Sequence, residues 1–152
     1  MDFFLVRHGE AKLECEDPRR PLTDQGRRDV ETVARAAAAR ELKIAEILHS
    51  DKLRAKETAE ILARFLVPGG GVRQISGLSP EDDPLLARAE LEAAESSVAL
   101  VGHLPHLGRL VSLLLTGDSE KTVFGFPTAT MVRLSRAGGA WKFGWALGPG
   151  ET

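Results

Sequence analysis

The sequence has only one cysteine, Cys15. A single cysteine excludes an internal disulfide framework, and it excludes a zinc site built from several cysteines of this chain. Glu14, Glu16 and Asp17 surround Cys15, and their negative charge disfavours the thiolate that a cysteine nucleophile needs. We therefore interpret Cys15 as an incidental loop residue.

Long apolar runs and an excess of charge of one sign are also absent. No apolar stretch approaches the roughly 20 residues that span a bilayer, and the charged N-terminal residues do not resemble a signal peptide. The net charge of −2 and the pI near 6.1 argue against broad binding of nucleic acid. We expect a cytoplasmic monomer with no membrane or nucleic-acid partner. The length predicts a single domain over residues 1–152.

The sequence does contain an alternation of short apolar runs and amphipathic stretches. The apolar runs have the length of buried strands, and they cover residues 3–6, 44–49, 72–75 and 98–101. Apolar residues at helical spacing predict a helix after each run, over residues 23–37, 50–66, 84–95 and 107–117. Thr23 and Ser50 stand where the first two helices begin, and we predict both as N-caps.

The pattern changes beyond Pro127. Trp141, Phe143 and Trp145 alternate with other residues after two consecutive glycines, which predicts a hairpin that covers a sheet edge. Alternating strands and helices followed by this hairpin define the expected fold class. It is an α/β fold, a three-layer α/β/α sandwich with a mostly parallel central sheet and a C-terminal antiparallel hairpin.

Four side chains that can carry positive charge follow the predicted strands. Arg7 and His8 come directly after the first strand, Arg54 begins the helix after the second, and His103 follows the strand that ends at Val101. In open α/β sheets the ligand site lies outside the carboxyl ends of the strands. A cationic cluster there needs an anion, and a phosphoryl group suits guanidinium groups well. Neutral imidazole is a nucleophile, so His8 can attack the phosphorus while the arginines hold its oxygens.

Each of these residues also has a simpler interpretation. His8 could merely end a strand, His103 could be a core histidine, and Arg54 could only solvate its helix. We favour a site because of the sequence motifs around these residues. His8 follows Arg7, His103 belongs to a Gly-His-x-Pro element, and Arg54 has a fitting spacing to Thr58 and Ala59. His106 lies three residues after His103, but no carboxylate stands at the accompanying helical spacing, so we predict no metal site.

Four motifs resemble, in order, those of the histidine phosphatase superfamily, also called the phosphoglycerate mutase-like family. They are Arg7-His8-Gly9, Leu22-Thr23 with Gly26, Ser50 with Arg54, Ala55, Thr58 and Ala59, and Gly102-His103 with Pro105. The short chain and the run Arg20-Pro21-Leu22-Thr23 resemble the compact SixA branch, whose members remove phosphate from phosphohistidine on signalling proteins.

The resemblance implies a mechanism. His8 would form a covalent phosphohistidine that water hydrolyses, and Arg7, Arg54 and His103 would hold the phosphoryl oxygens. Arg20 is a further candidate for substrate binding. The family mechanism requires no metal and no other cofactor.

The identity of the residue that would protonate the leaving group stays open. Larger family members use a carboxylate, and Glu81, Asp82 and Asp83 lie in the corresponding region. A phosphoramidate nitrogen takes a proton readily from solvent, so phosphohistidine could be cleaved without a positioned acid. The chain also departs from the family pattern at Asp51, which replaces a proline, and at Glu57, which replaces a glutamine. We expect Glu57 to place negative charge near Arg54.

Three functions follow from these observations. The first is a phosphohistidine phosphatase that acts on a phosphorylated histidine of a signalling protein and releases inorganic phosphate. The second is a phosphatase of small phosphomonoesters that uses the same site. The third, from another class, is a phosphate-binding regulatory module without turnover.

Overall fold

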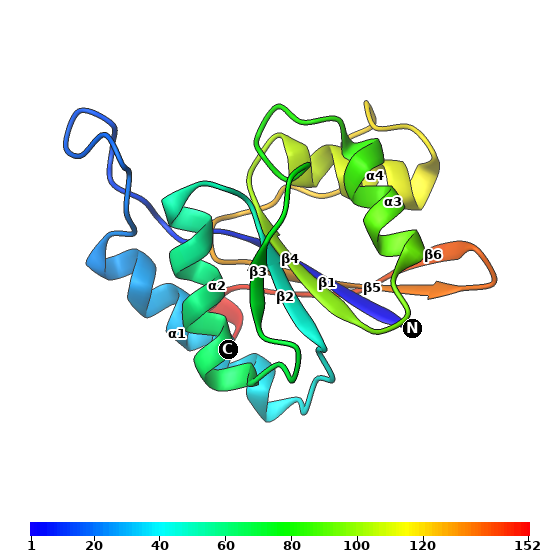
Figure 1. The fold of residues 1–152 in the computed structure, drawn as a ribbon, viewed down its shortest axis with the longest axis horizontal. Helices are drawn as coiled ribbons and strands as arrows, with labels where there is room; N and C mark the ends of the chain where they lie inside the picture. The colour runs from blue at the N-terminus through cyan, green and yellow to red at the C-terminus, as the bar shows by residue number, and fades with distance from the viewer.

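The computed structural model describes residues 1–152 and contains one six-stranded sheet with helices on both faces (Figure 1). The elements are β1 (Asp2–Arg7), α1 (Asp24–Ala39), β2 (Glu46–His49), α2 (Leu53–Leu66), β3 (Val72–Gln74), α3 (Pro84–Ala93), β4 (Val98–Gly102), α4 (His106–Thr116), β5 (Met131–Ala137), β6 (Ala140–Leu147) and a short 3₁₀ helix (Pro149–Glu151). None of the helices has both the length and the apolar character of a membrane span.

The strand order is β3-β2-β4-β1-β5-β6. Strands β3, β2, β4 and β1 run parallel, and β5 and β6 add an antiparallel hairpin beside β1. This arrangement confirms the predicted fold class. It also places the carboxyl ends of β1, β2 and β4 at one edge of the sheet, which is where ligands bind in such folds.

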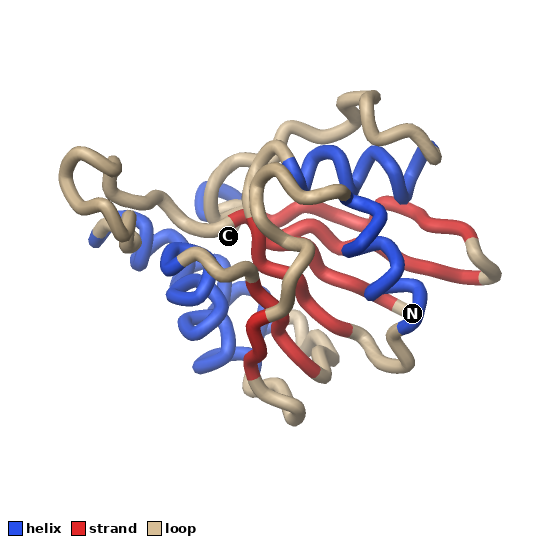
Figure 2. The backbone as a smooth tube through the Cα atoms, turned by 45° about the horizontal axis from the view of Figure 1, so that its top comes forward, coloured by secondary structure: helices blue, strands red, loops and turns tan.

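The central strand β1 supplies both cores because its side chains alternate between the two faces. Phe4 and Val6 pack into the apolar core under α1 and α2, and Phe3 and Leu5 pack into the core under α3 and α4. Figure 2 shows the sheet between the two pairs of helices. The continuous apolar run that predicted a strand buried on both faces therefore has a direct physical explanation.

The two predicted N-caps have different outcomes. The Thr23 hydroxyl accepts a hydrogen bond from the Gly26 N–H at 2.9 Å, which confirms it as the cap of α1. The prediction for Ser50 is wrong, because α2 begins after Lys52, which makes no side-chain cap bond. Ser50 directly follows β2, and its N–H donates to the Val101 carbonyl of β4 at 3.3 Å.

The C-terminal hairpin is confirmed, but its side-chain alternation is interrupted. The register between β5 and β6 shifts at Arg133 and Leu134. As a result Trp141 packs against Phe3 in one core, whereas Trp145 packs against Phe4 in the other. A β-bulge of this kind explains why the aromatic residues do not share one face.

Candidate active site

The ends of β1 and β4 bring the two candidate histidines together. Arg7 is in register with Gly102, and the His8 N–H donates to the Gly102 carbonyl at 3.1 Å. The centroids of the His8 and His103 rings are 5.0 Å apart, and the ring planes are tilted by 54°. Residues separated by most of the chain thus meet because their strands are parallel neighbours.

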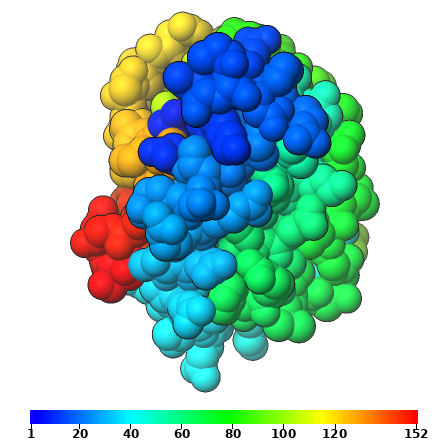
Figure 3. All heavy atoms as spheres, turned by 90° about the vertical axis from the view of Figure 1, so that its left-hand side faces the viewer, coloured from blue at the N-terminus to red at the C-terminus, as the bar shows by residue number.

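The segment before β5 fixes Arg7. Nη1 of Arg7 donates to the Phe126 carbonyl at 2.8 Å, and the Ala129 N–H donates to the His8 carbonyl at 3.1 Å. Figure 3 shows this yellow-to-orange segment at the top of the molecule beside the blue loop that follows β1. The two segments thus border the edge of the sheet that carries His8.

The hydrogen bond of His8 selects one tautomer. Its Nδ1 lies 2.7 Å from the Gly9 carbonyl oxygen, which can only accept, so Nδ1 carries the proton. In neutral imidazole the lone pair is then on Nε2. The pKa of His8 is lowered to about 4, mainly by burial; the Gly9 bond opposes this shift, and the charges of Arg54 and Arg7 contribute to it. His8 is therefore a neutral imidazole at neutral pH, with an unprotonated Nε2.

His103 is also neutral. Its pKa is lowered to about 2, mainly by burial and in smaller part by the neighbouring His8 and Arg54. Its Nε2 lies 2.6 Å from the Ser50 hydroxyl oxygen, and its Nδ1 is buried without a hydrogen-bond partner. Ser50 therefore contacts His103 instead of capping a helix, a contact that sequence reasoning missed.

The two arginines of the site are partly buried and keep hydrogen-bonding capacity. Burial lowers the pKa of both Arg7 and Arg54, and the positive charge of Arg20 adds to the effect on Arg54. The Nε atoms of Arg7 and Arg54 are buried without a partner. Two guanidinium groups with free donors beside two neutral imidazoles fit a tetrahedral oxyanion.

Contacts of Gly9 with both α1 and α2 fix the backbone after His8. The Gly9 N–H donates to the Thr58 hydroxyl at 3.1 Å, and that hydroxyl donates to the Arg54 carbonyl at 2.8 Å. A Cβ atom on Gly9 would lie 2.8 Å from the Val30 side chain and 2.9 Å from a backbone oxygen of Gly26. Thr58 thus joins the two motifs physically, a contact that the sequence did not indicate.

The carboxylates predicted as leaving-group acids make other contacts. Asp83 caps α3 by accepting from the Leu85 N–H at 2.9 Å, and Asp82 accepts from the Ser79 N–H at 2.9 Å. Glu81 and Asp83 line a separate hollow with Arg109. The hydrogen bonds and ion pairs of these three residues involve none of the cationic side chains of the candidate site.

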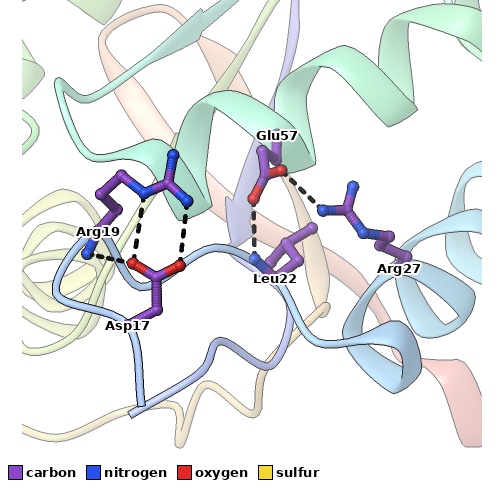
Figure 4. A network of polar contacts seen from close by, with 5 residues as sticks. All are labelled: Asp17, Arg19, Leu22, Arg27 and Glu57. Carbon is purple, nitrogen blue, oxygen red and sulfur yellow. Dashed lines mark hydrogen bonds and ion pairs between the residues drawn. The ribbon is translucent and has the colours of Figure 1, made fainter. Parts of the chain in front are cut away.

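The expectation for Glu57 is wrong. Its carboxylate accepts from the Leu22 N–H at 2.8 Å and pairs with Nη2 of Arg27 at 2.9 Å (Figure 4). The acidic residue that raises the pKa of Arg54, against burial, is Asp51. Glu57 lies one helical turn after Arg54, but its side chain reaches away toward α1 and the end of the loop.

Comparison with known proteins agrees with this geometry. Residues 3–74 match the family described as Histidine phosphatase superfamily (branch 1). The chain is 30% identical over 154 residues to the phosphohistidine phosphatase SixA of Escherichia coli (strain K12), an alignment that covers 98% of this chain and 94% of the relative. The chain belongs to the histidine phosphatase superfamily. This confirms the family predicted from the four motifs.

Solved structures of histidine phosphatases extend the comparison. The structure of the protein histidine phosphatase SixA complexed with tungstate has a TM-score of 0.88 and 30% identity, and the match covers 98% of this chain and 97% of that one. The alpha-ribazole phosphatase from Shigella flexneri shares the fold, with 14% identity and a TM-score of 0.75. That match covers 94% of each chain. The chain is a histidine-nucleophile phosphatase.

The lowered pKa of His8 predicts a pH dependence of stability. In the unfolded chain this imidazole has an ordinary pKa of 6.5, whereas in the folded protein it is about 4. Below pH 6.5 the unfolded state therefore binds more protons, so the contribution of His8 to stability is fully present above pH 6.5 and is lost as the pH falls toward 4. Urea unfolding of wild type and His8→Gln should show the variant gaining relative stability between about pH 7.5 and about pH 5. A constant difference between the two proteins would contradict this.

Proposed function

We propose that this histidine phosphatase hydrolyses phosphohistidine on a signalling protein and that His8 is its nucleophile. The observation that carries the proposal is the state of His8. Its Nδ1–H donates to the Gly9 carbonyl, its Nε2 is unprotonated and has a free lone pair, and the positive charges of arginines act on the imidazole. A neutral nucleophile beside positive charge is what attack on a phosphoryl group requires.

The reaction has two displacements. Nε2 of His8 attacks phosphorus in line, the phosphorus–nitrogen bond of the substrate breaks, and the leaving imidazole takes a proton from solvent. Water then attacks the phosphoryl group on His8, inorganic phosphate leaves, and the Nε2 lone pair is restored. Arg7, Arg54 and His103 hold the equatorial oxygens in both steps, and positioning with charge neutralisation supplies the acceleration.

The surroundings of the imidazoles favour phosphohistidine over an ester. The charges that shift the pKa of His8 belong to Arg54, Arg7 and Arg20, and those that shift the pKa of His103 belong to cationic or imidazole side chains. Asp82 and Asp83 act on a different imidazole, that of His106. Burial lowers the pKa of His106, and the negative charges of Asp82 and Asp83 raise it. An alkoxide leaving group needs a positioned acid, whereas a phosphoramidate nitrogen does not.

Turnover of two substrates tests this proposal. Because a general acid contributes about 10²–10⁴-fold, we expect kcat/KM for a protein phosphorylated on histidine to exceed that for a sugar phosphate, whose alkoxide leaving group must be protonated, by about 10²-fold or more. Glu81→Gln and Asp82→Asn should leave the phosphohistidine rate within about twofold. Suppose instead that the ester were hydrolysed as fast as the phosphohistidine protein and that Glu81→Gln or Asp82→Asn lost most of the ester activity. The protein would then be a phosphomonoesterase that uses that carboxylate.

A further inference from the structure

Glu57 joins three segments that are separate in the sequence. It lies on α2, its side chain is only 18% exposed, and both of its oxygens are engaged. Oε1 accepts from the Leu22 N–H at 2.8 Å, and Oε2 lies 2.9 Å from Nη2 of Arg27 on α1. Figure 4 shows the carboxylate between the two partners. Glu57 thus ties the end of the loop after β1 to both helices on this face of the sheet.

Leu22 is the point where that loop is anchored. Its side chain is 2% exposed, and its backbone forms an isolated antiparallel bridge with Ala11. Next to this bridge the Lys12 N–H donates to the Pro21 carbonyl at 2.8 Å. The two ends of the loop are therefore held together, and Glu57 supplies the hydrogen-bond acceptor for the N–H of Leu22.

Arg20 stands two residues before this anchor, in a conformation that needs support. Its φ is +48°, a region that costs a non-glycine residue energy and persists only when surrounding contacts enforce it. Its N–H donates to the Asp17 carbonyl at 2.9 Å, and its Nε donates to the Lys12 carbonyl at 3.0 Å. In this position its positive charge lowers the pKa of both His8 and Arg54, although burial is the larger cause for each.

We propose that Glu57 is a positioning residue which, by fixing Leu22, holds Arg20 beside His8 so that Arg20 binds a phosphoryl oxygen. This inference rests on the proposed function, and it adds Arg20, a candidate for substrate binding from the sequence, to the residues that hold the phosphoryl group. The pair between Glu57 and the half-exposed Arg27 adds little stability, as is usual for such pairs. Its effect is therefore on where the loop sits rather than on whether the protein folds.

Binding of inorganic phosphate and turnover of a phosphohistidine protein test the inference together. Glu57→Ala should raise KM, and the Kd for inorganic phosphate, by about fivefold to tenfold with kcat changed less than about twofold, because binding and not chemistry is impaired. Glu57→Gln keeps an acceptor for the Leu22 N–H and should recover most of the affinity. Arg20→Ala should match Glu57→Ala, and the double variant should be no weaker than Arg20→Ala alone.

The matched control is Glu60→Ala, an exposed residue on the same helix, which should leave both constants unchanged. Additive losses in the double variant would overturn the inference, as would an equal loss in Glu57→Ala and Glu57→Gln. The phosphate measurement separates the two proposals. If wild type failed to hydrolyse phosphohistidine while Glu57→Ala still weakened phosphate binding through Arg20, the proposed function would fall and the positioning by Glu57 would stand.

Discussion

Replacement of His8 by alanine is expected to reduce turnover of a phosphohistidine protein by a factor on the order of 10⁴ or more, because removal of a covalent nucleophile leaves no alternative route of similar rate. The same variant should form no phosphoenzyme. Wild type mixed with substrate and quenched should carry phosphate that is stable in base and labile in acid, as a phosphoramidate is. Phosphate that remained bound to His8→Ala after the quench would contradict His8 as the nucleophile.

Two controls make the result specific. Cys15→Ala removes the one thiol of the chain, which is exposed and far less suited to attack, and it should leave the rate unchanged. His8→Ala should still fold, and urea unfolding can establish this. Because Arg7 and Arg54 remain in the variant, it should also still bind inorganic phosphate. A variant that bound phosphate but did not turn over would separate nucleophilic attack from binding.

The fold and the gathering of the site residues follow from short-range patterns and one general rule. The apolar run of β1 predicted a strand buried on both faces, and the turn residues after β1 and β4 marked the strand ends. Since the carboxyl ends of parallel strands meet at one edge, the sequence alone predicts that Arg7, His8 and His103 lie together. In the structure the two histidine rings are indeed neighbours, 5.0 Å apart. Their catalytic roles stay predictions.

The errors concern side chains whose partners are distant in the sequence. Ser50 has the local signature of an N-cap, but its hydroxyl contacts His103, which is 53 residues away. Glu57 follows Arg54 by one helical turn, but its partner Leu22 is 35 residues earlier in the chain. A sequence pattern states which residues share a helix face, whereas the contact that a polar side chain makes depends on which other segments pack beside it. The register shift in the C-terminal hairpin belongs to the same class, because the pairing of two strands determines it.

Arg54→Ala is expected to lower kcat/KM by about 10³-fold, since a guanidinium aimed at the transferring phosphoryl group stabilises charge that is fully developed only in the transition state. Arg54 lies in the first turn of α2, and its carbonyl accepts from the Thr58 hydroxyl at 2.8 Å, so the backbone that carries it is fixed. Its Nε is buried without a partner, and burial lowers its pKa without removing its charge at neutral pH.

Arg54→Lys distinguishes the geometry of this group from its charge. A lysine keeps one positive charge but cannot make two parallel hydrogen bonds, so it should recover no more than about tenfold of the loss. Arg64→Ala is the matched control, because Arg64 lies on the same helix, is 62% exposed and pairs with Glu31 on the outer surface. It should change kcat/KM by less than about twofold. Full activity in Arg54→Lys would mean that charge alone suffices at this position, whereas full activity in Arg54→Ala would remove Arg54 from the site and leave Arg7 and His103 to hold the phosphoryl oxygens.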